Sequence, residues 1–212
     1  MNVGPEMARL MLDLRRQGVT EAGVLGAIEA TPRGIFVAEP FRGRAHEDVA
    51  LPIGHHQTLS QPSVVGRMTQ ALDVSQRMKV LEIGTGSGFQ AAILARLCRR
   101  LYTIERHPAL LKEAEERFEG LGLVNITTLT GDGSLGWPEQ APFERIMVTA
   151  AAADVPDVLL GQLSEGGIMI VPVGLDENDQ HLLRVRRTGD GVETDDLGPT
   201  RFVPLIAGGV ED

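Results

Sequence analysis

The sequence predicts an α/β fold, a doubly wound and mostly parallel sheet with an antiparallel addition at one edge and helices on its N-terminal side. Three observations predict it. Between residues 76 and 175, short apolar runs alternate with segments of helical spacing, which is typical of a parallel sheet with helices on both faces. Helical patterns precede this stretch. Two apolar runs without a helix between them follow it.

The 212 residues, 42% of them hydrophobic, are enough for one sizeable core. We therefore expect a single domain over residues 1–212 in three parts. Residues 1–75 hold the N-terminal helices and a long loop, residues 76–175 hold the core of the sheet, and residues 176–212 hold the C-terminal strands.

The N-terminal part is predicted to contain three helices. The apolar residues of Met7–Leu14 share one helical face. Thr20 is a candidate N-cap for a second helix. Residues 31–61 contain repeated prolines and glycines and predict an irregular loop, which at this length is usually functional when ordered. A third helix is expected over residues 62–72.

The core is predicted as alternating strands and helices. A last core helix is expected to begin near Pro156 with Asp154 as its cap, and to end at Gly166-Gly167. The antiparallel addition is expected from strands at 182–185 and 201–206, joined by a polar turn region. The core strands are expected at 79–83, 101–104, 126–129, 146–149 and 168–173, and the earlier helices at 89–97 and from Pro108.

Composition excludes several function classes. The net charge is −9 and no basic stripe stands out, so nucleic acid is not an expected partner. No apolar run approaches the roughly 18 residues of a membrane helix, and the amphipathic, charged N-terminus lacks the apolar region of a signal peptide, so a cytoplasmic protein is expected. The single cysteine, Cys98, excludes an internal disulfide and a multi-cysteine metal site, and is expected to be buried.

A glycine-rich loop follows the first predicted core strand. Glu82 ends the strand, and Gly84, Gly86 and Gly88 follow at alternate positions. A dinucleotide fingerprint would place a glycine where Phe89 stands, so a pyrophosphate cradle is disfavoured. The pattern resembles that of class I methyltransferases, whose cofactor S-adenosylmethionine carries a sulfonium cation and no phosphate. A structural turn is the alternative interpretation of the loop alone.

Acidic residues follow the next two strands as well. Glu105 ends the second strand, where its carboxylate can accept hydrogen bonds from both ribose hydroxyls. Asp132 follows the third strand and can accept from an adenine amino group, while Gly133 lets the base lie against backbone. Three such signals at three successive strand ends predict a cofactor site at one edge of the sheet.

Two other chemistries are disfavoured. A hydrolase of the G-x-S-x-G type is excluded, because neither Ser87 nor Ser134 has a glycine two residues before it. The adjacent His55 and His56 have no cysteine or carboxylate cluster at ligand spacing, so no metal is predicted.

Residues 51–62 read LPIGHHQTLSQP. From the residues alone, this is a polar loop in which Ser60 or Gln61 caps the following helix. The run also resembles the signature of the protein-L-isoaspartate O-methyltransferases, in which LPIGHGQTISQP is typical. The likeness continues through VLEIGTGSGFQAAILA, YTIER, GDGSLGWPEQAPFERIMVTAAA, QLSEGGIMIVPVG and RFVPL, and so covers nearly the whole chain.

The resemblance implies a repair enzyme that methylates the free carboxylate of L-isoaspartyl residues in damaged peptides and proteins, with S-adenosylmethionine as cofactor. The ester then closes to a succinimide without the enzyme. The resemblance assigns the active-site serine to Ser60, ribose binding to Glu105, and adenine binding to Asp132 with Gly133. It also places a loop over the cofactor, made of Gln57, Thr58, Leu59 and Ser60, and turns Gln180 toward the site.

The sequence departs from the family pattern at three positions. His56 stands where glycine is usual, Leu59 where isoleucine is common, and Ser63 where an aromatic residue is frequent. These departures put the substrate preference in question more than the catalysis. Two alternatives remain: a class I methyltransferase for another carboxylate or a small molecule, and a non-catalytic module that binds isoaspartyl peptides.

Overall fold

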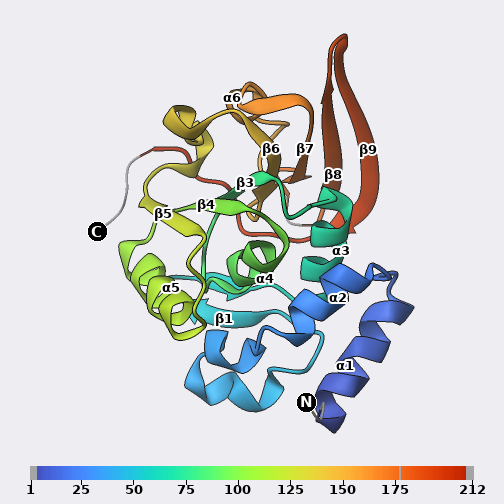
Figure 1. Ribbon diagram of the computed structural model, residues 1–212, viewed down its shortest axis with the longest axis vertical. Coiled ribbons are helices and arrows are strands. Elements are labelled where there is room, and N and C mark those ends of the chain that lie inside the picture. The colour runs from blue at the N-terminus through green and yellow to red at the C-terminus, as the bar shows by residue number, and fades with distance from the viewer. Residues whose placement is uncertain (1–3, 177, 209–212) are drawn as a thin grey trace.

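The computed structural model describes residues 4–176 and 178–208. Its centre is a seven-stranded sheet of strand order β5-β4-β3-β6-β7-β8-β9 (Figure 1). Strands β3 to β7 pair in parallel, whereas β8 and β9 pair antiparallel at one edge, so the predicted fold class is confirmed. The strands are β3 (Lys79–Ile83), β4 (Arg100–Glu105), β5 (Ile126–Thr130), β6 (Phe143–Val148), β7 (Leu163–Val173), β8 (Gln180–Thr188) and β9 (Gly191–Thr200).

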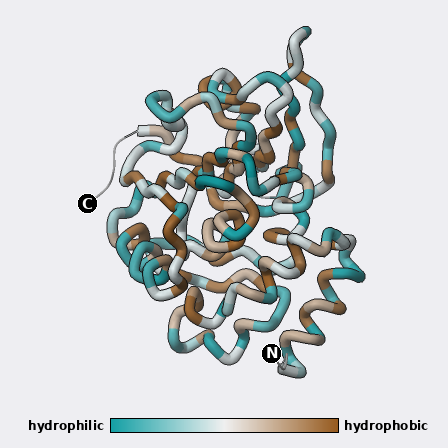
Figure 2. The backbone as a smooth tube through the Cα atoms, viewed as in Figure 1, coloured by the Kyte–Doolittle hydropathy of each residue, from teal (hydrophilic) through white to brown (hydrophobic). Residues whose placement is uncertain are grey.

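The core lies on both faces of this sheet. Alternate residues of each strand point to opposite faces, so Val80 and Leu81 belong to two different buried clusters. The central strands carry the most hydrophobic stretches of the chain (Figure 2). Helix α4 (Phe89–Leu97) is apolar over most of its surface and packs inside one cluster, where Cys98 is buried as expected. Helix α5 (Pro108–Gly120) is amphipathic and buries one face beside β4 and β5.

The strand order creates a crevice at one end of the sheet. Strand β3 lies between β4 and β6, because the chain builds β4 and β5 on one side and then crosses to β6 on the other. In open parallel sheets, ligands bind beyond the carboxyl ends of the strands at such a reversal. The glycine-rich loop after β3 lies at this point.

Helices α1 (Pro5–Arg16), α2 (Ala22–Glu29) and α3 (Pro62–Leu72) confirm the three predicted N-terminal helices. The predicted capping role of Thr20 is wrong. The N-cap position of α2 is Glu21, and no side chain of α2 caps it locally. The backbone N–H groups of Thr20 and Glu21 instead donate to the side-chain oxygen of Gln70 on α3. A residue fifty positions away in sequence thus supplies the acceptor, which no local pattern reveals.

The predicted irregular loop at residues 31–61 is only partly irregular. It contains two 3-10 turns, η1 (Arg33–Phe36) and η2 (Glu39–Arg44), and an antiparallel hairpin of β1 (Leu51–Gly54) and β2 (Gln57–Leu59). The hairpin turn has φ of 48° at His55 and 55° at His56. Positive φ at both central residues is the geometry of a tight type I′ turn, in which glycine is favoured, so His56 occupies a position that glycine adopts more readily.

Three late expectations are corrected. The helix α6 (Asp157–Leu160) has Pro156 at its N-cap, and Asp154 accepts only from the N–H of Val155. Strand β7 begins at Leu163 and continues through Gly166-Gly167, because Leu163 already pairs with Phe143 of β6 and the pairing resumes at Ile168 after an irregularity in register. The second late strand is the polar β9, which is exposed at the sheet edge and therefore lacks an apolar pattern. Residues 201–206 form only an isolated bridge from Pro204 to Ala151.

Candidate active site

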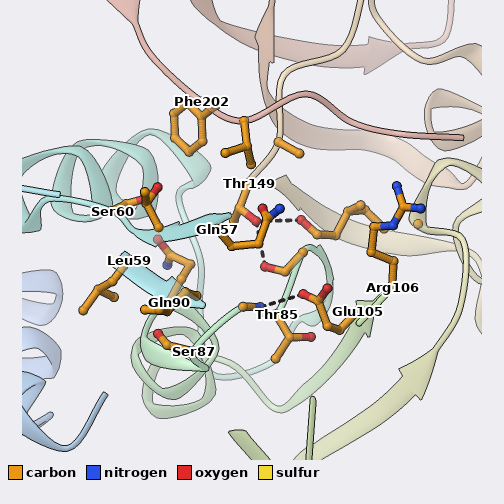
Figure 3. A pocket seen from close by; sticks show the side chains of 18 of the residues that line it. Gln57, Leu59, Ser60, Thr85, Ser87, Gln90, Glu105, Arg106, Thr149 and Phe202 are labelled. Atoms are coloured by element: carbon orange, nitrogen blue, oxygen red, sulfur yellow. Dashed lines mark hydrogen bonds between the residues drawn. The ribbon is translucent and has the colours of Figure 1, made fainter. Parts of the chain in front are cut away.

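A cavity lies at the carboxyl ends of the parallel strands (Figure 3). One side, the strand-end wall, consists of residues 83–87, 104–107, 133 and 149–150. The opposite side, the hairpin wall, consists of Ile53 and residues 57–60 of the β1–β2 hairpin together with the C-terminal segment 202–206. Val65, Met68, Phe89 and Gln90 close the space between the two walls. The cavity therefore joins the glycine-rich loop to the LPIGHHQTLSQP segment.

The glycines of the strand-end wall are required by close packing. Gly84 has φ of +92°, and a Cβ there would lie 2.3 Å from Oγ1 of Thr149. The Thr149 hydroxyl donates to the carbonyls of Ile83 (2.9 Å) and Gly84 (2.7 Å), so it is fixed in that position. A Cβ on Gly133 would lie 2.4 Å from Cγ2 of Ile83. The bare backbone of Gly84 and Gly133 thus borders the cavity where side chains do not fit, and Gly86 borders it with a φ of +53° that favours glycine.

Two of the predicted cofactor residues do not line the cavity. Gly88 lies at the start of α4, where a Cβ would be 2.7 Å from the ring of Phe118, so its role is to let α4 and α5 approach. Asp132 accepts from the backbone and hydroxyl of Ser134 through Oδ1, and from the N–H of Gly208 through Oδ2. Its neighbour Gly133 is the lining residue.

Glu105 lies at the centre of the strand-end wall and is only 5% exposed. Its Oε2 accepts from the N–H of Gly86 at 2.8 Å, and its Oε1 accepts from the N–H of His107 at 3.0 Å. Each carboxylate oxygen can accept a second hydrogen bond. The carboxylate is therefore held rigidly by backbone and keeps acceptor capacity toward the cavity, as two vicinal hydroxyls of a ribose require.

Glu82 was not among the predicted site residues, although it lies next to the last residue of β3, close to the glycine loop. It is fully buried, and its Oε2 accepts from the hydroxyl of Thr103, which in turn shares a hydrogen bond with Thr85. Burial raises the pKa of Glu82 to about 8; the Thr103 hydrogen bond opposes this shift and the Glu105 charge adds to it. Burial therefore favours the protonated form of Glu82, whose side chain lies behind the wall and hydrogen-bonds to Thr103.

The hairpin wall contains all four predicted residues of the loop, Gln57, Thr58, Leu59 and Ser60. The expectation that Ser60 or Gln61 caps α3 is wrong: Gln61 occupies the N-cap position, but no local side chain accepts there. Asp48 accepts from the N–H of Ser63 at 2.8 Å instead. Within the described residues, the Ser60 hydroxyl makes no hydrogen bond, and it lines the cavity.

The C-terminal part of the hairpin wall was missed, because residues 201–206 were expected to be a strand. Gln180 is buried, donates to the carbonyl of Phe202 at 3.1 Å and accepts from its N–H at 2.6 Å. Ala151 accepts from the N–H of Leu205 and donates to the carbonyl of Val203. Gln180 thus positions the wall and does not line the cavity itself.

The lining contains one carboxylate, Glu105, and two basic side chains, Arg106 and His107. No group of three or more histidine, cysteine or acidic side chains arranged for a metal ion occurs in the described residues. Nor does that part of the chain contain a helix long and apolar enough to cross a membrane. The cavity offers a fixed carboxylate on one wall and a free hydroxyl on the other.

Comparison with known proteins identifies the family. The family model for protein-L-isoaspartate(D-aspartate) O-methyltransferase matches residues 6–209. A protein-L-isoaspartate O-methyltransferase of Paramagnetospirillum magneticum is 59% identical over 205 residues, which are 96% of each chain. The protein of the same name from Rhodospirillum rubrum is 59% identical over 210 residues, 98% of this chain and 96% of that one.

Solved structures agree. A protein-L-isoaspartate O-methyltransferase superposes with a TM-score of 0.83 at 27% identity, over 96% of this chain and 67% of that one. A putative protein-L-isoaspartate O-methyltransferase from Plasmodium falciparum, in complex with S-adenosyl-L-homocysteine, has a TM-score of 0.79 at 22% identity, over 93% of this chain and 97% of that one, and supports the fold. The chain belongs to the protein-L-isoaspartate(D-aspartate) O-methyltransferase family.

Proposed function

We propose that this chain transfers a methyl group from S-adenosylmethionine to the free carboxylate of L-isoaspartyl residues in peptides and proteins, with Ser60 as the catalytic residue that holds this carboxylate. One observation carries the proposal. The Ser60 hydroxyl lines the same cavity as Glu105 and is not used to cap α3, because Asp48 does this. Its donor is therefore available to a ligand.

The strand-end wall suits S-adenosylmethionine. This cofactor supplies an electrophilic methyl group on a sulfonium sulfur. Glu105 would accept from the ribose hydroxyls, and the backbone of Gly84, Gly86 and Gly133 would border the rest of the ligand. Asp132 would take part at the adenine only where the N–H of Gly208 shares or leaves its Oδ2. We assign no direct cofactor contact to Gly88.

The hairpin wall suits the acceptor. A free side-chain carboxylate has a pKa near 4 and is ionised at neutral pH, so its methylation needs no general base. What the protein must supply is orientation and exclusion of water. Ser60 donates a hydrogen bond to one carboxylate oxygen, while Gln57, Thr58 and Leu59 cover the cavity beside it. Because the protein has only to orient the acceptor and exclude water, a cavity without a catalytic base is sufficient.

Two related proposals concern partners and location. The acceptor is a peptide or protein chain and not nucleic acid, which the net charge of −9 supports. A cytoplasmic location is supported by the single cysteine, whose thiol is buried, so that the fold uses no disulfide.

The test is methyl transfer from labelled S-adenosylmethionine to two matched peptides, one isoaspartyl and one aspartyl. We expect transfer to the isoaspartyl peptide alone. Transfer to neither peptide, with S-adenosylhomocysteine still bound, would overturn the proposal and favour a binding module or another acceptor. Equal transfer to both peptides would favour a carboxylate methyltransferase without isoaspartyl specificity.

A further inference from the structure

Arg33 is a buried cation that does not line the cavity. It lies in η1 and is 2% exposed. Its Nη1 donates to the carbonyls of Ala45 (3.0 Å) and Glu47 (3.3 Å), and its Nη2 donates to the carbonyls of Val49 (2.8 Å) and Ser60 (3.1 Å). Four of its five N–H donors thus hold backbone oxygens, and the last of these oxygens belongs to the proposed catalytic serine.

Asp48 completes this arrangement from the other side. It lies between two of the residues whose carbonyls Arg33 holds, and its carboxylate attracts the Arg33 guanidinium. The same carboxylate accepts from the N–H of Ser63 and from the side chain of Gln17. Arg33 therefore binds the chain just before Pro62, and Asp48 binds it just after. Together they fix the backbone on both sides of the joint between β2 and α3.

We propose that Arg33 is the positioning residue of the acceptor site: it sets the place of the Ser60 hydroxyl by holding the Ser60 carbonyl in common with residues 45–49. The inference rests on the proposed function of Ser60. A buried guanidinium is a suitable group for this, because its planar fork reaches several carbonyls at fixed angles. A lysine has one nitrogen on a flexible stem and does not reproduce the fork.

The burial of the Arg33 guanidinium makes this arrangement unusual. Desolvation lowers the pKa of Arg33 to about 10, and the Asp48 charge opposes the shift. The guanidinium also lies 5.9 Å from the ring centroid of Phe89, which lines the cavity. Arg33 thus remains charged at neutral pH, and its N–H groups donate to uncharged backbone carbonyls of one irregular segment. A segment with few backbone hydrogen bonds of its own depends on such donors.

The experiment is a double-mutant cycle of Arg33→Lys with Ser60→Ala, assayed with an isoaspartyl peptide. We expect Arg33→Lys alone to lower kcat at least about tenfold, and to change kcat less than about twofold when Ser60→Ala is already present. Affinity for S-adenosylhomocysteine should stay within about threefold, since the strand-end wall is unchanged. The proposal would be overturned if the two substitutions lowered kcat by independent factors that multiply in the double mutant. It would also be overturned if Arg33→Lys weakened cofactor binding and left kcat unchanged.

Arg145→Lys is the matched control. Arg145 is also buried, and it donates to the carbonyls of Asp73 and Glu144, which do not line the cavity. The Arg145→Lys protein should be less stable than the wild type, while its kcat should stay within about twofold of the wild-type value. A wild-type protein that is inactive on the isoaspartyl peptide rejects the proposed function itself, whereas an active wild type with an equally active Arg33→Lys rejects only the role of Arg33.

A second variant serves if Arg33→Lys does not fold. Asp48→Asn keeps an oxygen for the N–H of Ser63 but removes the carboxylate that attracts Arg33. We expect a decrease in kcat of about threefold or more, again absent in the Ser60→Ala background. An unchanged kcat in a folded Asp48→Asn protein would count against the proposal.

Discussion

The two walls of the cavity are built in different ways. The strand-end wall continues directly from β3, β4 and β6, whose parallel ladders lie in the core of the molecule. The hairpin wall consists of a short hairpin and segment 202–206, which side chains such as Arg33, Asp48 and Gln180 hold in place. In the proposed function, the first wall is a rigid receptor for the cofactor. The second wall, in the same proposal, is a surface held in place by side chains and meets the acceptor.

The largest effect on cofactor affinity is expected from a substitution at Gly84, where the strand-end wall leaves no space for a side chain. Gly84→Ala combines φ of +92° with a Cβ 2.3 Å from the fixed hydroxyl of Thr149. We expect affinity for S-adenosylhomocysteine, measured by titration calorimetry, to fall at least about 100-fold. Gly26→Ala is the control, because a Cβ there meets nothing within 4 Å and helix α2 should gain about 0.5–1 kcal/mol. Unchanged cofactor affinity in the Gly84→Ala protein would contradict the assignment of the cofactor to the strand-end wall.

A smaller effect is expected from Glu105→Gln. The amide keeps the shape but places an NH₂ group against one of the two N–H groups, of Gly86 or His107, that now donate to the carboxylate. We expect affinity for S-adenosylhomocysteine to fall about 10- to 50-fold, and the melting temperature to fall by a few degrees because one buried N–H loses its acceptor. If kcat falls with cofactor affinity intact, Glu105 acts on the acceptor and the assignment of the walls is reversed.

The two walls also differ in how far the sequence predicts them. Strand β3 and helix α4 were predicted at their observed bounds, because local periodicity and the glycines determine them. Glu105, Gly84, Gly86 and Gly133 were placed in the cavity for the same reason. Asp132 was also predicted there but does not line the cavity, and a tertiary contact with Gly208 that the sequence pattern does not contain shapes its surroundings.

Of the hairpin wall, only residues 57–60 were identified, and only through the family resemblance. Nothing near Arg33 in the sequence indicates that its side chain reaches the carbonyl of Ser60, 27 residues later. Residues 201–206 have the apolar pattern of a strand, yet their apolar side chains line a cavity. Contacts of this kind depend on the folded chain, and a periodicity argument does not contain them.

The pH dependence of the free energy of unfolding tests the role of Glu82, which lies behind the strand-end wall. The folded-state pKa of Glu82, about 8, lies above its ordinary value of 4.5, so the folded protein holds a proton that the unfolded chain releases between these values. This contribution to stability is complete below pH 4.5 and is lost as the pH rises through 8. From pH 6 to pH 8, urea denaturation should show a loss of about 2 kcal/mol in the wild type relative to Glu82→Gln. Parallel pH profiles of the two proteins would contradict this account of Glu82.

The central claim, that one wall binds the cofactor and the other holds the acceptor, is tested most directly by Ser60→Ala. Turnover of an isoaspartyl peptide and binding of S-adenosylhomocysteine are measured on the same protein preparation. The account predicts that kcat falls at least about 100-fold, while cofactor affinity stays within about twofold of the wild type. Full turnover at saturating peptide, or a loss of cofactor affinity that matches the loss of turnover, would contradict it.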